Sequence, residues 1–173
     1  YGDVLALFIA HEIDDYVFLI NVYVGMGASK HMANDEEGAL DAYCKALAVA
    51  EMLYGRGSEA GLPILLNKAL SHILLNHPVE ALNELGKARA MVGKIKQCSE
   101  RETFLAAVMH NTAVAYMALK KPKDAIQEYK AALRLEERIH GREHSEYARS
   151  LFGIGEAYAA AGAVNLALES FLE

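Results

Sequence analysis

The chain has 173 residues, of which 53% are hydrophobic and 23% are charged. This is the composition of a folded globular protein, and it excludes wholesale disorder. The net charge is −6 and there is no run of Lys and Arg residues, so we do not expect nucleic acid as a partner.

An apolar stretch extends from Val4 to Val24 near the N-terminus. Charged and polar side chains interrupt it at His11, Glu12, Asp14, Asp15 and Asn21. Charges are costly near the middle of a membrane span, and no uninterrupted run approaches the roughly 20 residues that a span needs. We therefore expect buried helices here and no membrane span, with residues 3–11 forming an additional N-terminal helix.

Residues 14–54 are expected to form a first helical hairpin. The segment from Asn34 to Glu37 is a helix-start signal with acidic residues in the first turn, and it predicts where the second helix begins. The first helix is less well defined, because Gly25 and Gly27 are poor helix formers in a helix interior. Either this helix is broken near Gly25 or the sequence lacks part of it.

Three further hairpins are predicted over residues 62–96, 100–139 and 146–173. In each of them apolar residues recur at spacings of three and four, which is the period of a helix with one buried face. In the second of these hairpins, Ser99 and Glu102 have the spacing of a capping box. That spacing predicts a helix that begins near Glu100.

A pattern that recurs about every 42 to 44 residues decides the fold class. The segments that align without gaps are residues 67–82, 111–126 and 153–168. Each indicates a helix, a tight turn and a helix, and a fixed period of this length is typical of a solenoid. We predict an all-α superhelix of about four hairpins that forms a single domain over residues 1–173. Because the sequence begins at Tyr1 and stops at Glu173 inside an expected helix, we interpret it as part of a longer protein.

These residues resemble the tetratricopeptide repeat family. The matching positions are Met109, Thr112, Ala113, Tyr116, Ala125, Tyr129 and Ala132 in one hairpin, and Leu151, Ile154, Gly155, Tyr158, Gly162, Ala167 and Phe171 in the next. The usual repeat of the family has about 34 residues. The longer period here, with the link at residues 136–148, resembles the kinesin light chain and LGN type, although Ser145 stands where that type has Pro.

The resemblance implies that the first helix of each hairpin lines a concave groove. The positions expected to face this groove are Leu66, Asn67, Leu70, His110, Asn111, Val114, Arg149, Phe152, Gly153 and Glu156. Asn67 and Asn111 are equivalent, and an amide both donates and accepts, so the pair can hold the backbone of an extended peptide. The alternative is that these are merely solvated amides. The apolar neighbours suit an extended or amphipathic partner with apolar anchors.

We therefore expect a non-catalytic protein-interaction module or scaffold that uses no cofactor. The alternative is a structural solenoid that packs laterally or end to end in a large cytoskeletal, ciliary or other assembly, because the apolar residues Leu166, Leu168, Phe171 and Leu172 have no covering helix. Binding of Hsp70 or Hsp90 tails is not expected. Leu66, Leu70 and Gly153 stand where the clamp of chaperone-binding members needs Lys, Asn and Arg.

A metal-binding enzyme is the remote alternative. His140 and His144 lie four apart with Glu136, Glu137 and Glu143 nearby, a set that could ligate zinc. Gly141 falls between the two His residues, however, at an expected bend, so we favour a polar link in which His144 caps the next helix, and no metal. The two cysteines, Cys44 and Cys98, are interpreted as free thiols in a reducing compartment, and a disulfide between them is the alternative. With the resemblance, this favours a cytoplasmic location, with possible residence on the cytoskeleton or cilium.

Overall fold

The computed structural model describes residues 16–173, and this part of the chain consists of α-helices joined by short turns and links. The helices are α2 (Tyr16–Met32), α3 (Glu36–Tyr54), α4 (Leu62–Leu74), α5 (Pro78–Val92), α6 (Cys98–Ala118), α7 (Pro122–His140), α8 (Ser145–Ala160) and α9 (Val164–Leu172), with a short 3-10 helix η1 (Glu59–Gly61) before α4. The helix expected over residues 3–11 lies outside the described residues.

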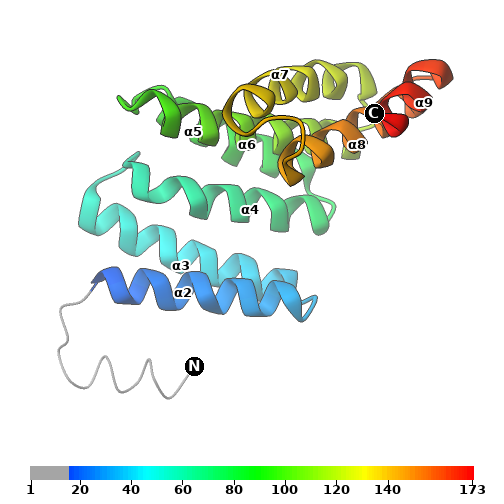
Figure 1. The fold of residues 1–173 in the computed structure, drawn as a ribbon. Helices are drawn as coiled ribbons and strands as arrows, with labels where there is room; N and C mark the ends of the chain where they lie inside the picture. The colour runs from blue at the N-terminus through cyan, green and yellow to red at the C-terminus, as the bar shows by residue number, and fades with distance from the viewer. Residues whose placement is uncertain (1–15) are drawn as a thin grey trace.

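Consecutive helices pack as four hairpins, α2 with α3, α4 with α5, α6 with α7 and α8 with α9. The hairpins are stacked in chain order, from α2 and α3 at one end to α8 and α9 at the other (Figure 1). The predicted all-α superhelix of about four hairpins is confirmed.

Each hairpin turn contains one residue with a positive φ angle. These residues are Asn34 (58°), Asn76 (59°), Lys120 (58°) and Gly162 (79°). They occupy equivalent positions in the repeat and end the first helix of each hairpin with a left-handed residue. Asn and Gly tolerate this conformation, whereas a Lys residue adopts it at a steric cost. The turn geometry therefore repeats even where the residue type does not.

Small residues let the two helices of a hairpin approach closely. Ala39, Ala81 and Ala125 on the second helices have no exposed surface, and Ala167 retains only 4%. The first helix of the first hairpin also carries a small residue at this interface. Gly27 on α2 makes room for the ring of Tyr43 on α3, because an added Cβ would lie 2.5 Å from Tyr43 Cε1.

Helix α2 runs without a break from Tyr16 to Met32, so the first of the two alternatives, a helix broken near Gly25, is wrong. Gly27 is placed there by the close approach of the Tyr43 ring and not by a bend in the helix. Helix burial against α3 outweighs the poor helix propensity of the two glycines, because most helical stability in proteins comes from tertiary packing.

Helix α6 begins at Cys98, two residues before the predicted start. Its N-cap residue Gln97 makes no side-chain cap hydrogen bond, so the capping box expected from Ser99 and Glu102 does not form. Glu102 instead forms an ion pair with Arg138 of α7, with 2.7 Å between Arg138 Nη2 and Glu102 Oε1. The prediction at the start of α8 holds, since His144 is its N-cap and the Nδ1 atom accepts from the Glu146 amide at 3.3 Å.

Candidate functional site

The first helices of successive hairpins form one side of the stack. Helix α4 packs directly against α6, and α6 packs against α8. The second helices α5 and α7 are bridged by a side-chain pair, with 2.7 Å between Nη2 of Arg89 and Oε2 of Glu128. The positions predicted to face a groove therefore lie on three helices that run beside one another.

Asn67 on α4 and Asn111 on α6 are the best-placed polar residues of this set. Both side chains are partly exposed, and neither amide makes a hydrogen bond to another residue within 16–173. Each amide therefore keeps its donor and acceptor groups available for a ligand. Because the two residues occupy equivalent positions one repeat apart, they present the same chemistry twice along one face.

Asn67 and Asn111 occupy the same position of successive repeats, which we call the Asn register. In the repeats before and after them, this position is a glycine. Gly25 of α2 stands 42 residues before Asn67, and Gly153 of α8 stands 42 residues after Asn111. At Gly153 the Tyr129 ring fills the space, because an added Cβ would lie 2.5 Å from Tyr129 Cζ. At Gly25 nothing among residues 16–173 lies within 4 Å of an added Cβ. Gly153 is therefore a packing residue and not a groove residue.

His110 is also buried, with only 6% of its surface exposed, so the expectation that it faces the groove is wrong. Its Nδ1 atom lies 2.8 Å from Ser150 Oγ, and Ser150 Oγ donates to Glu136 Oε1 at 2.9 Å. This network joins α6, α7 and α8. The sequence gives no signal for it, because the three residues share no motif or fixed spacing.

Burial decides the ionisation of this network. It lowers the pKa of His110 to about 4, with a smaller contribution from the charge of Arg149. Burial also raises the pKa of Glu136 to about 6, although the hydrogen bond from Ser150 opposes that change. At neutral pH the ring is therefore uncharged and the carboxylate is ionised, with the Glu136 Oε2 atom buried without a hydrogen bond to any described residue.

The remaining predicted groove residues differ in exposure. Leu66, Leu70 and Val114 are partly buried, and Arg149, Phe152 and Glu156 are exposed. Arg149 forms an ion pair with Glu146 of its own helix. The side chain of Phe152 is 58% exposed and contacts the ring of Phe171, with 5.4 Å between the ring centroids. Phe152 therefore belongs to the end of the stack as well as to the face of α8.

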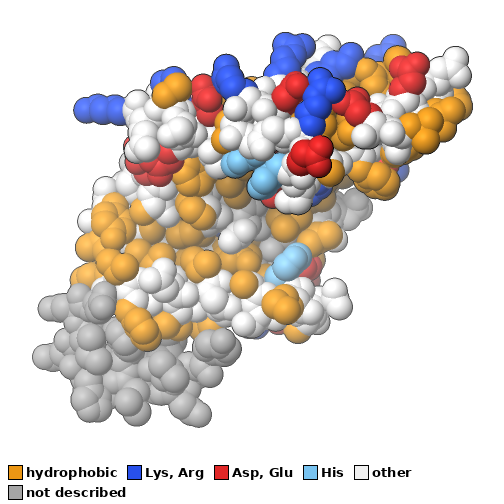
Figure 2. All heavy atoms as spheres, viewed as in Figure 1, with side chains coloured by type: hydrophobic (Ala, Val, Ile, Leu, Met, Phe, Trp, Pro, Cys, Tyr) orange, Lys and Arg blue, Asp and Glu red, His pale blue; other side chains and the backbone are white. Residues whose placement is uncertain are grey.

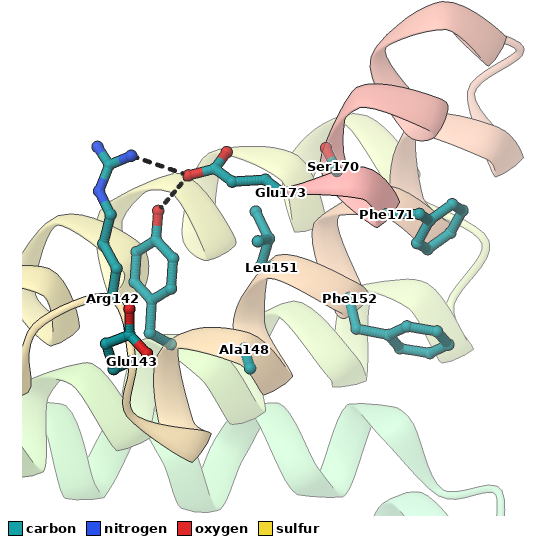
Figure 3. A pocket seen from close by; sticks show the side chains of 9 residues that line it. Arg142, Glu143, Ala148, Leu151, Phe152, Ser170, Phe171 and Glu173 are labelled. Atoms are coloured by element: carbon teal, nitrogen blue, oxygen red, sulfur yellow. Dashed lines mark hydrogen bonds and ion pairs between the residues drawn. The ribbon is translucent and has the colours of Figure 1, made fainter.

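That end of the stack contains a pocket of about 720 Å³ between α8, α9 and the link before α8. On one side Glu173 Oε1 accepts from Arg142 Nη1 at 3.1 Å and from the Tyr147 hydroxyl at 2.9 Å (Figure 3). On the other side Phe152 and Phe171 point away from these polar groups, toward the outer edge (Figure 3). The pocket thus has one charged wall and one aromatic wall.

A buried ion pair on the second hairpin was not predicted from the sequence. Lys68 Nζ of α4 lies 3.2 Å from Glu84 Oε1 of α5, and both residues are 8% exposed. Burial raises the pKa of Glu84, but the charges of Lys68 and Lys87 outweigh it and hold that pKa below its usual value. A Lys and a Glu 16 residues apart on two different helices cannot be paired from spacing alone.

Neither a metal centre nor a membrane helix is present in the part of the chain that the structure describes. No three His, Cys, Asp or Glu residues within 16–173 are grouped as metal ligands would be. The rings of His140 and His144 stack on each other, with centroids 4.3 Å apart. Cys44 and Cys98 are both exposed, and they form no disulfide with each other. None of the helices in these residues is both long and apolar enough to cross a membrane.

Comparison with known proteins agrees with this architecture. Residues 104–173 match the family model of the tetratricopeptide repeat. No curated protein matches the chain at the level of sequence. Among solved structures, BtubC (BKLC) from P. vanneervenii is similar with a TM-score of 0.80 and 20% identity, over 95% of this chain and 66% of that one.

Two other solved structures are similar over 91% of this chain. The nearly identical TPR-like repeats assigned to a kinesin light chain from Podosopora anserina give a TM-score of 0.76 at 19% identity and are covered over 74% of their length. A Rap protein in complex with Competence and Sporulation Factor gives 0.78 at 15% identity and is covered over 42%. The chain thus spans about two thirds of the BtubC chain and less than half of the Rap chain, and these likenesses show the fold.

Proposed function

We propose that the chain, whose residues 104–173 match the tetratricopeptide repeat model, is a non-catalytic interaction module that holds an extended or amphipathic segment of a partner protein. This fold is a scaffold for protein–protein interaction. The segment lies along α4, α6 and α8, and Asn67 and Asn111 hold its backbone. The observation that supports this proposal is the pair of equivalent amides, one repeat apart, that have no hydrogen-bond partner within the described residues.

The neighbouring side chains define the kind of segment. Leu66, Leu70 and Val114 are partly exposed beside the two amides, so apolar side chains of the segment can contact them. Arg149 and Glu156 add one charge of each sign on α8, beyond the end of the Asn register. The Rap protein of this fold was solved with a bound factor, which supports a binding role for such a stack. We also propose a cytoplasmic location, in association with the cytoskeleton or a cilium.

The test compares two double variants in affinity capture from cell extract with readout by mass spectrometry. Asn67→Ala/Asn111→Ala removes the two amides on the first helices α4 and α6. Asn83→Ala/Gln127→Ala removes two exposed amides on the second helices α5 and α7. A partner that is lost only with the first variant supports the groove, provided that both variants keep the helical circular dichroism of the wild type. A partner retained by both variants would refute it.

A second candidate function is end-to-end packing in a larger assembly. It is favoured by the apolar surface of the last hairpin, where Val164 is 70%, Leu168 57% and Leu172 77% exposed. Exposed apolar patches of this kind mark interaction sites. If this surface joins copies of the chain, Leu168→Lys/Leu172→Lys should abolish concentration-dependent association in sedimentation velocity. Val79→Lys, at a 65% exposed apolar position on α5, is the control and should not affect it.

A further inference from the structure

A second cleft, of about 390 Å³, lies away from the face of α4, α6 and α8 that carries Asn67 and Asn111. It is formed by the end of α3, the link between α3 and α4, and the C-terminal half of α5, which lie at the same edge of the stack (Figure 1). Its lining residues are Leu47, Ala50, Glu51, Arg56, Gly57, Ser58, Gly61, Leu65, Lys87, Ala90, Met91 and Lys94. None of the predicted groove residues is among them.

The floor of this cleft is apolar. Leu65 and Met91 are buried, with 2% and 7% of their surfaces exposed, and Leu47 is partly buried beside them. Leu47 and Met91 pack closely against Gly61, since an added Cβ there would be 3.2 Å from both Leu47 Cδ1 and Met91 Cε. The volume is at the small end of the roughly 300–1,000 Å³ that is usual for ligand pockets. The cleft therefore suits a single large apolar side chain.

The rim of the cleft carries an excess of positive charge from Arg56, Lys87 and Lys94. Lys87 is bonded to Glu84, but the Glu84 charge is already balanced by Lys68, so the charge of Lys87 is surplus.

The other two cations are also weakly compensated. Lys94 forms no ion pair with any residue that the structure describes. Among the residues that the structure describes, Arg56 is paired only with Glu51 at 3.7 Å, and its side chain is 91% exposed. Such exposed pairs contribute little, so an incoming carboxylate can replace Glu51.

The cleft adjoins the most basic part of the chain. Residues 87–142 contain 12 of the 17 Lys and Arg residues but only 6 of the 23 Asp and Glu residues. Lys and Arg side chains are gathered over α5 and α7 in the space-filling view (Figure 2). A protein with a net charge of −6 thus carries most of its Lys and Arg residues in the stretch of chain that includes Lys87 and Lys94, and this favours acidic partners there.

We infer that this cleft is a second docking site, which binds an acidic protein segment carrying one large apolar anchor residue. The anchor enters the apolar floor beside Leu65 and Met91. Flanking carboxylates pair with Lys94 and Arg56 on the rim. This site is separate from the face that carries Asn67 and Asn111, so one chain binds two different segments.

The test measures fluorescence anisotropy at about 0.15 M salt, where surface charges are largely screened beyond about 8 Å. The probe is a fluorescein-labelled peptide of Asp and Glu residues with one central Leu. We expect Lys94→Glu to weaken binding by about tenfold or more, because it replaces an attraction with a repulsion. Ala90→Phe should weaken it as well, since Ala90 is exposed at the cleft and a larger side chain there fills it.

Two controls separate this site from general charge attraction. Lys123→Glu makes the same charge change at an exposed residue of α7 that does not line the cleft, and it should leave binding unchanged. A peptide with Ser in place of Leu should bind more weakly than the probe.

Four results would overturn the inference. The first two are equal losses of affinity with Lys94→Glu and Lys123→Glu, and no loss of affinity with Ala90→Phe. The third is binding of the Ser peptide as tight as that of the Leu probe. The fourth is displacement of the probe by a single-stranded oligonucleotide to the same extent from the wild type and from Ala90→Phe. The Asn67→Ala/Asn111→Ala variant should bind the probe like the wild type. Failure of the groove proposal and failure of this one are therefore distinguishable.

Discussion

The ring of Tyr129 on α7 lies against Gly153 on α8 so closely that no side chain fits there. An added Cβ would be 2.5 Å from Tyr129 Cζ and 2.8 Å from its Cε1 atom. The same ring is steeply inclined to the ring of His110 on α6, with 5.4 Å between the ring centroids and 70° between the ring planes. Tyr129 thus joins the last two hairpins and also ends the Asn register, because the third position in that register cannot carry an amide.

We expect Gly153→Ala to destabilise the protein by about 1–3 kcal/mol, the usual cost of overpacking a filled core. The measurement is the free energy of unfolding in urea. Combining it with Tyr129→Leu should cost less than the sum of the two single changes, since Leu85 fills the equivalent position one repeat earlier. Gly25→Ala is the matched control. No atom of the described residues lies within 4 Å of its added Cβ, so this change should stabilise α2 by up to about 1 kcal/mol.

Lys120 offers a second test, of the hairpin turns. Its φ angle of 58° is costly for a residue with a Cβ, and Gly162 occupies the equivalent position in the next hairpin. Lys120→Gly should therefore raise the unfolding free energy by about 1 kcal/mol. Lys121→Gly is the control, because Lys121 has a φ angle of −111° and gains nothing from glycine. Equal effects of the two changes would contradict this account of the turn.

Ser150 should be far more important than its size suggests. Ser150→Ala leaves His110 Nδ1 and Glu136 Oε1 buried without the hydroxyl that bridges them. Leaving buried polar groups unpaired costs about 1–3 kcal/mol. Ser170→Ala, which removes only a hydrogen bond to the Leu166 carbonyl within α9, should cost about 0.5 kcal/mol or less. Thermal and urea unfolding of both variants would show whether the difference exists.

The same network predicts a pH dependence of stability. Burial raises the pKa of Glu136 from its usual 4.5 to about 6, so its contribution to stability is present below pH 4.5 and is lost as the pH rises through 6. Glu136→Gln removes this loss. The variant should therefore gain stability relative to the wild type between pH 4.5 and 6.

His110 acts in the opposite direction. Its pKa falls from 6.5 to about 4, so its contribution is present above pH 6.5 and is lost as the pH falls through 4. His110 is retained in both the wild type and Glu136→Gln, so the difference between their urea midpoints from pH 4 to 7 reports mainly on Glu136. A difference that stays constant over this range would show that Glu136 does not titrate as described.

Lys68 and Lys87 both pair with the carboxylate of Glu84, and we predict that they differ in how much they contribute to stability. Lys68→Met leaves the buried Glu84 with the more exposed Lys87 only, and breaking a buried pair costs about 3–5 kcal/mol. Lys87→Met should cost about 1 kcal/mol or less, because its side chain is 53% exposed. Similar unfolding free energies for the two variants would refute the assignment of Lys68 as the principal partner.

The candidate site was predictable only in part. Asn67 and Asn111 stand out as candidates because a repeat places equivalent residues on the same face of successive first helices, and periodicity is visible in a sequence. His110 was misassigned because the repeat register gives its helix face but not the depth at which the neighbouring hairpin covers it. The cleft beside Lys94 was missed altogether, since its walls come from α3, a link and α5.

The sequence by itself determined the number of hairpins, most of the turns between them and the small residues that let paired helices approach. These are local or periodic properties, set by helix propensity and by hydrophobic residues that recur at helical spacing. Only the tertiary structure decided which residues are covered. Tyr129 occupies the place of an amide at Gly153, and Ser150 links His110 to Glu136, because the stacking of one hairpin on the next sets distances between side chains that no spacing along the chain encodes.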